Sequence, residues 1–388
     1  MKTPFNKPYL TGKEAHYLYQ AVYSGHISGN GVYTKKCQAF FEERFGFKKT
    51  LLTTSCTDAL EMCALLIDIQ PGDEVIVPSY TFVSTALAFV RQGAKLIFAD
   101  SRKDHPGMDE SSLESLITPK TKAIVPVHYA GVACDMEIVM EVAKKHNIFV
   151  IEDAAQAIDS YYTVTKLHSS LGDQGAKLAL GSIGHLATFS FHETKNIQCG
   201  EGGLLAINND RFEKRAEVLW EKGTNRAEFF RGEVNKYGWV DTGSSFLPNE
   251  LTASFLYAQL EEMDSIQQRR KEIWNGYYEG LKDWANENKV HLPLVPDYAT
   301  NNGHMFYLIC PNADFRTMLI KHLKNENIHA VFHYLSLHKS EYIEKLQYMT
   351  QDCPLSDEYT DQLLRLPLYY ELKSLSSIIS IITNYKHL

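Results

Sequence analysis

Residues 148–156 read IFVIEDAAQ, a run of four apolar residues that ends in two carboxylates, Glu152 and Asp153. A short apolar run with polar residues directly after it is typical of a strand buried in a parallel sheet. A buried carboxylate is costly unless it meets a cation or several hydrogen-bond donors. We therefore expect Asp153 to face a positive partner at the end of its strand. The alternative is a solvated carboxylate or a helix cap at that position.

Similar apolar runs alternate with longer amphipathic segments from about residue 50 to residue 210. This alternation predicts an α/β fold, in which a mostly parallel sheet carries helices on both faces. We expect strands at 74–77, 95–99, 123–127, 149–152, 187–191 and 203–207, and helices at 57–67, 82–92 and 135–146. The turn at residues 71–73, Pro-Gly-Asp, ends the first of these helices.

The remaining third of the chain has a different pattern. Residues 250–281 are periodic enough for one extended helix, and a strand at 304–310, a helix at 315–326, a strand at 329–333 and closing helices follow. We therefore expect a large domain at residues 1–248, with an N-terminal arm, and a smaller α/β domain at 249–388. Residues 163–181 show no clear period and are expected to form a loop or insertion.

Composition excludes several classes of protein. Among the 388 residues, 39 Lys and Arg stand against 47 Asp and Glu, a net charge of -8, so no overall positive field attracts nucleic acid or an anionic membrane. No apolar run approaches the roughly 20 residues that span a bilayer, and the first residues lack the pattern of a secretory signal. Seven scattered cysteines without a C-x-x-C pair argue against zinc or a redox dithiol, and we expect a cytoplasmic protein without a metal.

Three further polar stretches are candidates for a binding site. TTSCTD at 53–58 precedes a helix, where free N–H groups bind phosphate, although Ser and Thr are also ordinary helix caps. PSYTFV at 78–83 places Phe82 where its ring covers a planar ligand or packs in the core. FSFHETKN at 189–196, with CGEGG at 199–203, places Lys195 where desolvation makes it an amine nucleophile, although most lysines are solvated.

The carboxyl ends of parallel strands meet at one edge of a sheet, so these features are expected to lie together. A phosphate-binding helix start, an aromatic ring, a carboxylate and an amine are what pyridoxal phosphate requires. Its phosphate needs N–H donors, its ring a flat cover, its pyridinium nitrogen a carboxylate and its aldehyde an amine. The combination of features predicts a pyridoxal phosphate site.

The chain resembles the DegT/DnrJ/EryC group of sugar-nucleotide aminotransferases in the stretches TTSCTDALEM, PGDEVIVPSYTFVSTA, PVHYAGVACDM, VIEDAAQAI, TFSFHETKN, GEGG, EKGTNRAEFFRG and AVFHYLSLH. The resemblance implies a fold-type-I pyridoxal phosphate transferase, similar to aspartate aminotransferase, that works as a homodimer with shared active sites. It implies that Lys195 bonds to the cofactor and shuttles the proton, and that Asp153 holds the ring nitrogen. It also implies cofactor contacts, with Gln156 near the 3-hydroxyl, Phe82 over the ring, and Cys56, Thr57, Asp58 and Ser190 at the phosphate.

Within the family, HYAGVACDM, FSFHETKN and EKGTNRAEFFRG resemble members that aminate carbon 4 of a dTDP-linked keto sugar for enterobacterial common antigen. The implied amino donor is L-glutamate. For the substrate we expect contacts from His192 in a supporting role, from the cations Lys222, Arg226 and Arg231, and from His333, Tyr334 and His338. The alternatives are a solvated charged loop for the three cations and a strand end for the last three residues.

Two differences from the family pattern and several alternatives remain. Many members place an Asn where this chain reads Ser-Ser-Phe-Leu at 244–247, and residues 163–181 are longer than usual. The new amine is axial, giving a galacto product, or equatorial, giving a gluco product, and the reacting carbon is 4 or 3. The nucleotide is dTDP or UDP. Two other classes of protein are alternatives. A related dehydratase has histidine in place of the lysine, so Lys195 argues against it. A non-catalytic protein on this fold has no need of Lys195, Asp153 and Gln156, so their presence argues against that class.

Overall fold

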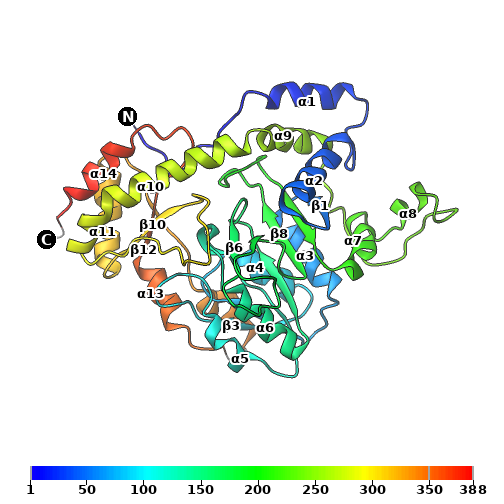
Figure 1. Cartoon of the computed structure of the whole chain (residues 1–388), viewed down its shortest axis with the longest axis horizontal. Coiled ribbons are helices and arrows are strands. Elements are labelled where there is room, and N and C mark those ends of the chain that lie inside the picture. Colours follow the sequence, from blue (N-terminus) through cyan, green and yellow to red (C-terminus); the bar gives the residue numbers. More distant parts are fainter. Residues whose placement is uncertain (1, 348–349, 387–388) are drawn as a thin grey trace.

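A seven-stranded sheet lies at the centre of the larger part of the molecule (Figure 1). The computed structural model describes residues 2–347 and 350–386. The strands are β1 (Lys49–Thr53), β2 (Glu74–Pro78), β3 (Lys95–Ala99), β4 (Thr121–Ile124), β5 (Phe149–Asp153), β8 (Leu186–Ser190) and β9 (Gly203–Ile207), in the order β1-β9-β8-β5-β4-β2-β3. Only the two pairs that include β9 are antiparallel. The expectation of a mostly parallel sheet is confirmed, and β1 is a strand that the sequence did not predict.

Helices cover both faces of this sheet because successive strand residues point to opposite sides. Val150 of β5 belongs to a core shared with α2 (Val32–Phe45) and α6 (Met136–His146). Its neighbour Ile151 belongs to a second core, shared with α3 (Cys56–Leu66), α4 (Val83–Val90) and α7 (Glu213–Trp220). The short helix α5 (Leu113–Leu116) lies between β3 and β4 in the chain. The three layers are those of an α/β fold.

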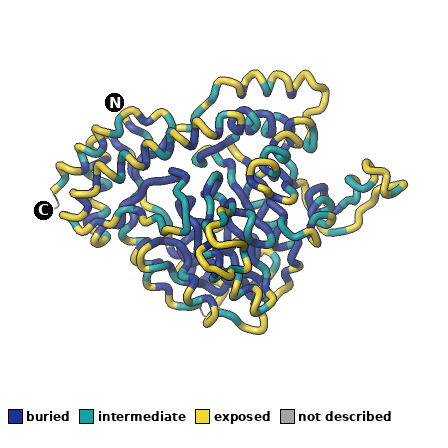
Figure 2. Tube along the Cα trace, viewed as in Figure 1, coloured by how far each residue is buried: buried dark blue, intermediate teal, exposed yellow. Residues whose placement is uncertain are grey.

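Two elements extend beyond these layers. α1 (Glu14–Tyr23) packs along α9 (Glu250–Leu260) at the surface, and α8 (Arg226–Phe230) projects from the body after α7 (Figure 1). Figure 2 shows α1 and the segment after α8 as largely exposed, whereas the strands are buried. Trp239 is 83% exposed and Phe230 is 69% exposed.

The expected single helix over 250–281 is two helices, α9 and α10 (Met263–Glu287). The join is a turn in which Glu262 N–H bonds to Gln259 O, one residue closer than in an α-helix. Lys13, just before α1, lies 2.7 Å from Glu262 and also pairs with Glu261. No Gly or Pro marks this turn, so the periodicity continues across it without a stop signal.

The smaller part of the molecule is built on a three-stranded antiparallel sheet in the order β10-β12-β11. Its strands are β10 (Phe306–Ile309), β11 (Val331–Phe332) and β12 (Leu363–Leu366), and its helices are α11 (Ala313–Asn325), α13 (Pro354–Gln362) and α14 (Leu375–Thr383). α12 (Glu341–Leu346) lies between β11 and α13 in the chain, but its buried Ile343 belongs to a core of the large sheet. A separate core joins this sheet to α10, α11 and α14. Since α9 packs in the core of the large sheet, this core begins inside α10, and the boundary near residue 248 stays a prediction.

Residues 163–181, expected to form a loop, contain part of a hairpin. β6 (Tyr161–Thr163) pairs antiparallel with β7 (Lys177–Ala179). Buried Glu137 on α6 anchors the loop after β6, because its carboxylate accepts from Thr165 N–H at 2.9 Å and from Lys166 N–H at 3.2 Å. The strands have three residues each, too few for alternation to be recognised in the sequence. Among the helices of residues 2–347 and 350–386, none combines the length and the apolar character that crossing a bilayer requires.

Candidate active site

A cavity of about 550 Å³ lies where the two parts of the molecule meet, at the carboxyl ends of the parallel strands. The large part contributes the start of α3, the segment between β2 and α4, the end of β5 and the segment after β8. The small part contributes residues after β11 and one residue of β12. The predicted residues that line it are Cys56, Thr57, Phe82, Asp153, Gln156, Ser190, His192, Lys195, His333 and Tyr334. Residues from five separate stretches of sequence therefore meet in one place.

The start of α3 forms one end of this cavity. Ser55 caps the helix by accepting from Asp58 N–H at 3.0 Å, and the next two residues, Cys56 and Thr57, line the cavity. Thr57 and Ser84 bond to each other through their hydroxyls at 2.8 Å. N–H groups at a helix start, with hydroxyls beside them, form a site for a phosphate. Asp58 does not line the cavity, because its carboxylate accepts from the hydroxyls of Thr54 and Ser55.

Gly203 explains part of the glycine cluster after Lys195. It begins β9 and passes so close to α3 that a Cβ would lie 2.4 Å from Cys56 N and from the carbonyl of Ser55. Any side chain would therefore displace the start of α3. Gly200 serves the turn before it, with a φ of +79°.

Asp153 ends β5 and is 4% exposed. Thr85 Oγ1 donates to its Oδ2 at 2.7 Å, and Ala155 N–H donates to its Oδ1 at 3.1 Å. Burial raises the pKa of Asp153, although both donors and the charge of Lys195 oppose that rise. The negative charge is thus only partly compensated by protein groups, which suits a cationic ring nitrogen. Thr85 is a site residue that the sequence did not predict.

Two residues suited to a planar ring lie beside this carboxylate. Phe82 precedes α4 and is 56% exposed although it lines the cavity, and its ring centroid is 6.0 Å from that of Tyr334. Gln156 accepts from Ala130 N–H at 2.7 Å and donates to Tyr334 Oη at 3.3 Å. The amide is therefore fixed at the cavity wall, and the exposed ring of Phe82 is free to cover a flat ligand.

Lys195 lies in a tight turn after β8, where its N–H bonds to His192 O at 2.8 Å. The next residue, Asn196, is buried and donates to Gln267 Oε1 at 2.8 Å and to Asn302 O at 2.9 Å. Its Oδ1 lies 2.8 Å from His304 Nδ1. These bonds hold the lysine turn against α10 and the segment before β10. Burial lowers the pKa of Lys195, and the charge of Arg365 lowers it further, whereas Cys56 and Asp153 act in the opposite sense.

The wall from the small part contains His333, Tyr334 and Arg365. Tyr129 Oη lies 3.1 Å from His333 Nδ1, and Arg365 Nη1 donates to His333 Nε2 at 3.1 Å. Burial lowers the pKa of His333 well below its ordinary value, so the ring is neutral. Arg365 is a site residue that was not predicted, and the one signal for it in the sequence is a charge between the apolar residues of LLRLPL at 363–368.

Four predicted substrate residues are not at this cavity. Lys222, Arg226 and Arg231 line another one, of about 730 Å³, around α8. Arg231 pairs there with Glu217 at 2.8 Å. His338 is buried beneath the segment after β2 and lies 2.7 Å from the hydroxyl of Ser79. His192, in contrast, lines the candidate active-site cavity, where its ring Nδ1 lies 2.9 Å from Thr194 Oγ1.

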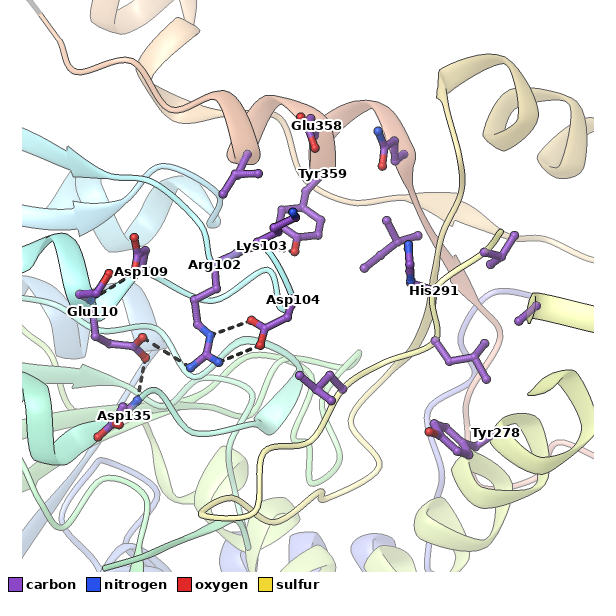
Figure 3. Close-up of a pocket in the computed structure, with 18 of the residues that line it drawn as sticks. Arg102, Lys103, Asp104, Asp109, Glu110, Asp135, Tyr278, His291, Glu358 and Tyr359 are labelled. Atoms are coloured by element: carbon purple, nitrogen blue, oxygen red, sulfur yellow. Dashed lines mark hydrogen bonds and ion pairs between the residues drawn. The ribbon is translucent and has the colours of Figure 1, made fainter. Parts of the chain in front are cut away.

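A larger cavity, of about 1100 Å³, lies elsewhere between the two parts (Figure 3). Several of its charged side chains already pair with one another: Arg102 Nε lies 2.9 Å from Asp104, and Arg102 Nη1 lies 3.7 Å from Glu110. Glu110 also accepts from Asp135 N–H at 2.7 Å. The two helix starts at this cavity are capped by the carboxylates of Asp109 and Asp135, which disfavour an anion such as phosphate. The chemistry therefore favours the smaller cavity, whose donor set fits pyridoxal phosphate.

Known proteins resemble this chain over most of its length. A model of the DegT/DnrJ/EryC1/StrS aminotransferase family matches residues 8–383. The chain is 32% identical over 374 residues to the spore coat polysaccharide biosynthesis protein SpsC of Bacillus subtilis, which covers 94% of this chain and 92% of SpsC.

Solved structures share the whole fold. Spr1654 of Streptococcus pneumoniae, assigned as a sugar aminotransferase, in its PMP form has a TM-score of 0.87 and 26% identity, over 99% of this chain and 97% of that one. DesV of S. venezuelae, in complex with a ketimine intermediate, has a TM-score of 0.86 and 26% identity over 100% of both chains. The expected fold class is confirmed, and the chain belongs to the DegT/DnrJ/EryC1/StrS aminotransferase family.

Proposed function

We propose that the protein transfers the amino group of L-glutamate to carbon 4 of dTDP-4-keto-6-deoxy-D-glucose, giving dTDP-4-amino-4,6-dideoxy-D-galactose, with pyridoxal phosphate as cofactor. The observation that carries the proposal is the meeting of Lys195, Asp153 and the start of α3 in one cavity. Spr1654 has been solved in a PLP form and a PMP form, which supports this cofactor. The name of SpsC, a polysaccharide biosynthesis protein, supports a product used for surface polysaccharide.

When bound, the cofactor supplies an electron sink for the pair released at the substrate carbon. Asp153, held by Thr85, keeps the ring nitrogen positively charged. The start of α3, with the hydroxyls of Thr57, Ser84 and Ser190, binds the phosphate. The exposed ring of Phe82 would cover one face of the cofactor, and the Gln156 amide would bind the ring's 3-hydroxyl. In this arrangement each polar group of the cofactor meets a residue of complementary chemistry.

Lys195 moves the proton. In a transamination a proton must pass between the amino-bearing carbon of the substrate and the former aldehyde carbon of the cofactor, two carbons joined through the transferred nitrogen, and one amine near both would serve as base and then as acid. Burial lowers the pKa of Lys195, so the neutral amine that accepts a proton is more populated near neutral pH than in a solvated lysine. The lysine turn, fixed through Asn196, keeps this amine in place.

The nucleotide requires a second copy of the chain in this proposal. Lys222, Arg226 and Arg231 lie around α8, away from the candidate active site of the same chain. The helix α8 projects from the body, and Phe230 at its end is exposed (Figure 1). In a homodimer with shared active sites, these cations face the diphosphate in the partner's site. His333 and Tyr334 approach the sugar from the small part. The reaction takes place in the cytoplasm, in keeping with seven free cysteines.

The test is product analysis. The purified protein, with dTDP-4-keto-6-deoxyglucose and L-glutamate, is expected to give a 4-amino sugar whose proton NMR spectrum shows a small coupling between the hydrogens on carbons 3 and 4. A large coupling would identify the gluco product and would contradict the proposed stereochemistry. Preference for a UDP-linked or a 3-keto sugar would contradict the proposed substrate.

The cofactor is tested separately by colour. The wild-type protein is expected to purify yellow, or to turn yellow when pyridoxal phosphate is added, and Lys195→Ala is expected to lose this absorbance. Lys321→Ala, at an exposed lysine of α11, is the matched control and should stay yellow. A wild-type protein that stays colourless with added cofactor would contradict the enzymatic proposal and would favour a non-catalytic role.

A further inference from the structure

The segment that leads into β10, residues 302–304, lies against both stretches of the large part that carry Gln156 and the lysine turn. Asn302 is fully buried, and its Nδ2 donates to Gln156 O at 2.8 Å and to Ile158 O at 2.9 Å. Its Oδ1 accepts from His304 N–H at 2.9 Å. The polar atoms of this side chain are therefore all used, and the backbone of Gln156 is fixed to the segment.

His304 joins the same segment to the lysine turn. Its ring is buried, and Nδ1 lies 2.8 Å from Oδ1 of Asn196, the residue that follows Lys195. Asn196 Nδ2 already donates to Gln267 Oε1 and to Asn302 O, so Asn196 Oδ1 is an acceptor. The His304 ring must therefore donate this hydrogen bond from Nδ1.

The His304 ring is neutral and carries one proton. Burial lowers the pKa of His304 well below its ordinary value, and the charge of Lys195 lowers it further. The one proton of the ring is on Nδ1, because Asn196 accepts it there. The orientation of the Asn196 side chain thus depends on a single donor from the other part of the molecule.

Arg270 of α10 anchors the same segment. Its guanidinium is buried, and it donates from Nε to Gly303 O at 3.1 Å and from Nη2 to His304 O at 2.7 Å. Gly303 has a φ of +63°, and a Cβ there would lie 2.8 Å from the backbone of Arg270. A shift of the segment would therefore break several buried hydrogen bonds, so the segment is a fixed support for the side chains that it holds.

We propose that His304 is a positioning residue for Lys195, which it fixes through Asn196, so that the small part sets where the catalytic amine lies. The inference rests on the proposed aminotransferase function and adds to it the group that holds the lysine turn. Lys195 must reach two carbons in succession, and a displacement of about 1 Å at a reacting group can cost about 100-fold in rate. A donor that fixes the next residue therefore has an effect on the chemistry beyond its effect on stability.

Three variants separate positioning from stability. His304→Phe keeps a buried ring and removes the donor to Asn196. His304→Asn places an amide nitrogen at the position of Nδ1, so it keeps the donor without the ring. His185→Phe is the matched control, because half-buried His185 also uses Nδ1, which accepts from Val150 N–H at 3.0 Å, at the opposite end of β8 from the lysine turn.

The first measurement is hydrogen exchange of the full-length apoprotein, followed in peptides that contain residues 192–199. His304→Phe leaves Asn196 Oδ1 buried without a donor, so exchange in the lysine turn is expected to be about 5- to 150-fold faster than in the wild type. His304→Asn is expected to recover most of the protection. His185→Phe is expected to leave exchange in this turn unchanged.

The second measurement is the pH at which an amine-directed reagent labels Lys195 in the apoprotein. A loosened turn lets water reach the amine, so part of the burial that lowers the pKa of Lys195 is lost. The labelling midpoint of His304→Phe is therefore expected to move up, toward that of exposed Lys321. His304→Asn should move it back toward the wild-type midpoint, and His185→Phe should not move it.

The third measurement is the half-reaction of the holoenzyme with L-glutamate, followed by visible absorbance. A displaced amine slows the proton transfer but leaves the binding of the amino donor intact. His304→Phe is therefore expected to lower the maximal rate about 10- to 100-fold, with little change in the glutamate concentration that gives half of that rate. His304→Asn should restore most of the rate.

Three outcomes would overturn the inference. In the first, His304→Phe lowers the melting temperature but matches His185→Phe in exchange, labelling and rate. In the second, His304→Asn loses as much as His304→Phe, so the donor to Asn196 is not what holds the turn. In the third, His304→Phe does not fold, and Gln267→Met, which removes one acceptor of Asn196 Nδ2, matches the wild type in exchange and labelling.

The proposed function fails separately. A wild-type holoenzyme that reacts with no amino donor would overturn that function, whereas the two apoprotein measurements would still decide whether His304 positions Lys195.

Discussion

The hydrogen bond from Thr85 to Asp153 is expected to set the lowest pH at which the protein holds its cofactor. Asp153 must be ionised to hold a protonated ring nitrogen, so affinity falls as the pH drops through the pKa of Asp153 in the apoprotein. Burial raises that pKa, and the Thr85 hydroxyl, at 2.7 Å, opposes the rise by stabilising the charged form. Thr85→Val keeps the shape and removes the donor, so the pKa of Asp153 rises further.

The size of the effect follows from the hydrogen bond. A bond to a charged group contributes about 1.5–3 kcal/mol, so the variant favours the protonated carboxyl about 10- to 150-fold more than the wild type does. On the acid side of the profile the variant should bind pyridoxal phosphate weaker by about that factor. Well above both pKa values, Asp153 is ionised in both proteins, so the two affinities should converge. The acid limb of the profile therefore moves to higher pH.

The assay is a titration of apoprotein with pyridoxal phosphate, followed by visible absorbance at a series of pH values. Titration of the free cofactor is common to both proteins and cancels in the comparison. Thr50→Val is the matched control, because Thr50 is also a buried threonine and its hydroxyl donates to Glu42 Oε1 at 3.1 Å, on α2 and away from the cavity. This control is expected to lose stability without moving the acid limb. Superimposable limbs for wild type and Thr85→Val would refute the role given to this bond.

Three other perturbations test separate parts of the structure. Gly203→Ala adds a Cβ 2.4 Å from Cys56 N, so it should displace the start of α3 and weaken pyridoxal phosphate binding by at least about tenfold, measured by the same titration. The lowered pKa of Lys195 predicts that, in the apoprotein, an amine-directed reagent labels it at lower pH than exposed Lys321, which peptide mass spectrometry checks. Hydrogen bonds from Thr165 lower the pKa of Glu137 to about 2 despite its burial, so this carboxylate stabilises the fold above its ordinary pKa, and that stability is lost as the pH falls toward 2. Glu137→Gln should therefore lower the melting temperature at pH 7 and differ less from wild type in acid.

The sequence predicted the parts of the fold whose pattern is local. The expected strand at 95–99 coincides with β3, and those at 74–77 and 149–152 fall one residue short of β2 and β5, because both faces of these strands are buried and the runs are continuously apolar. The strand β12 was missed although it is also buried, because Arg365 interrupts its four residues. A charge inside so short an apolar run removes the pattern that predicts a strand. The charge is explained by the candidate active-site cavity, which Arg365 lines.

The site residues that could be predicted are those that come at or soon after the end of a strand. Asp153 and Ser190 are the last residues of β5 and β8, and Lys195 follows soon after, so one rule about strand ends places all three at the same edge. Thr85 reaches Asp153 from the first turn of α4, and Arg365 reaches the cavity from the other sheet. Neither position follows from any local pattern.

The same distinction explains why the three expected cations are not at the cavity of their own chain. The resemblance placed Lys222, Arg226 and Arg231 at a substrate by their residue types, whereas their place in space depends on α8, which projects away from the sheet (Figure 1). Because α8 has no buried residues, contacts within its own chain do not fix where its side chains act. Within one chain the cavity brings together Lys195, Asp153 and the start of α3, whereas in our proposal the nucleotide end of the second substrate is bound by the partner. A monomer is accordingly expected to carry out the half-reaction with glutamate and to lose the one with the nucleotide sugar.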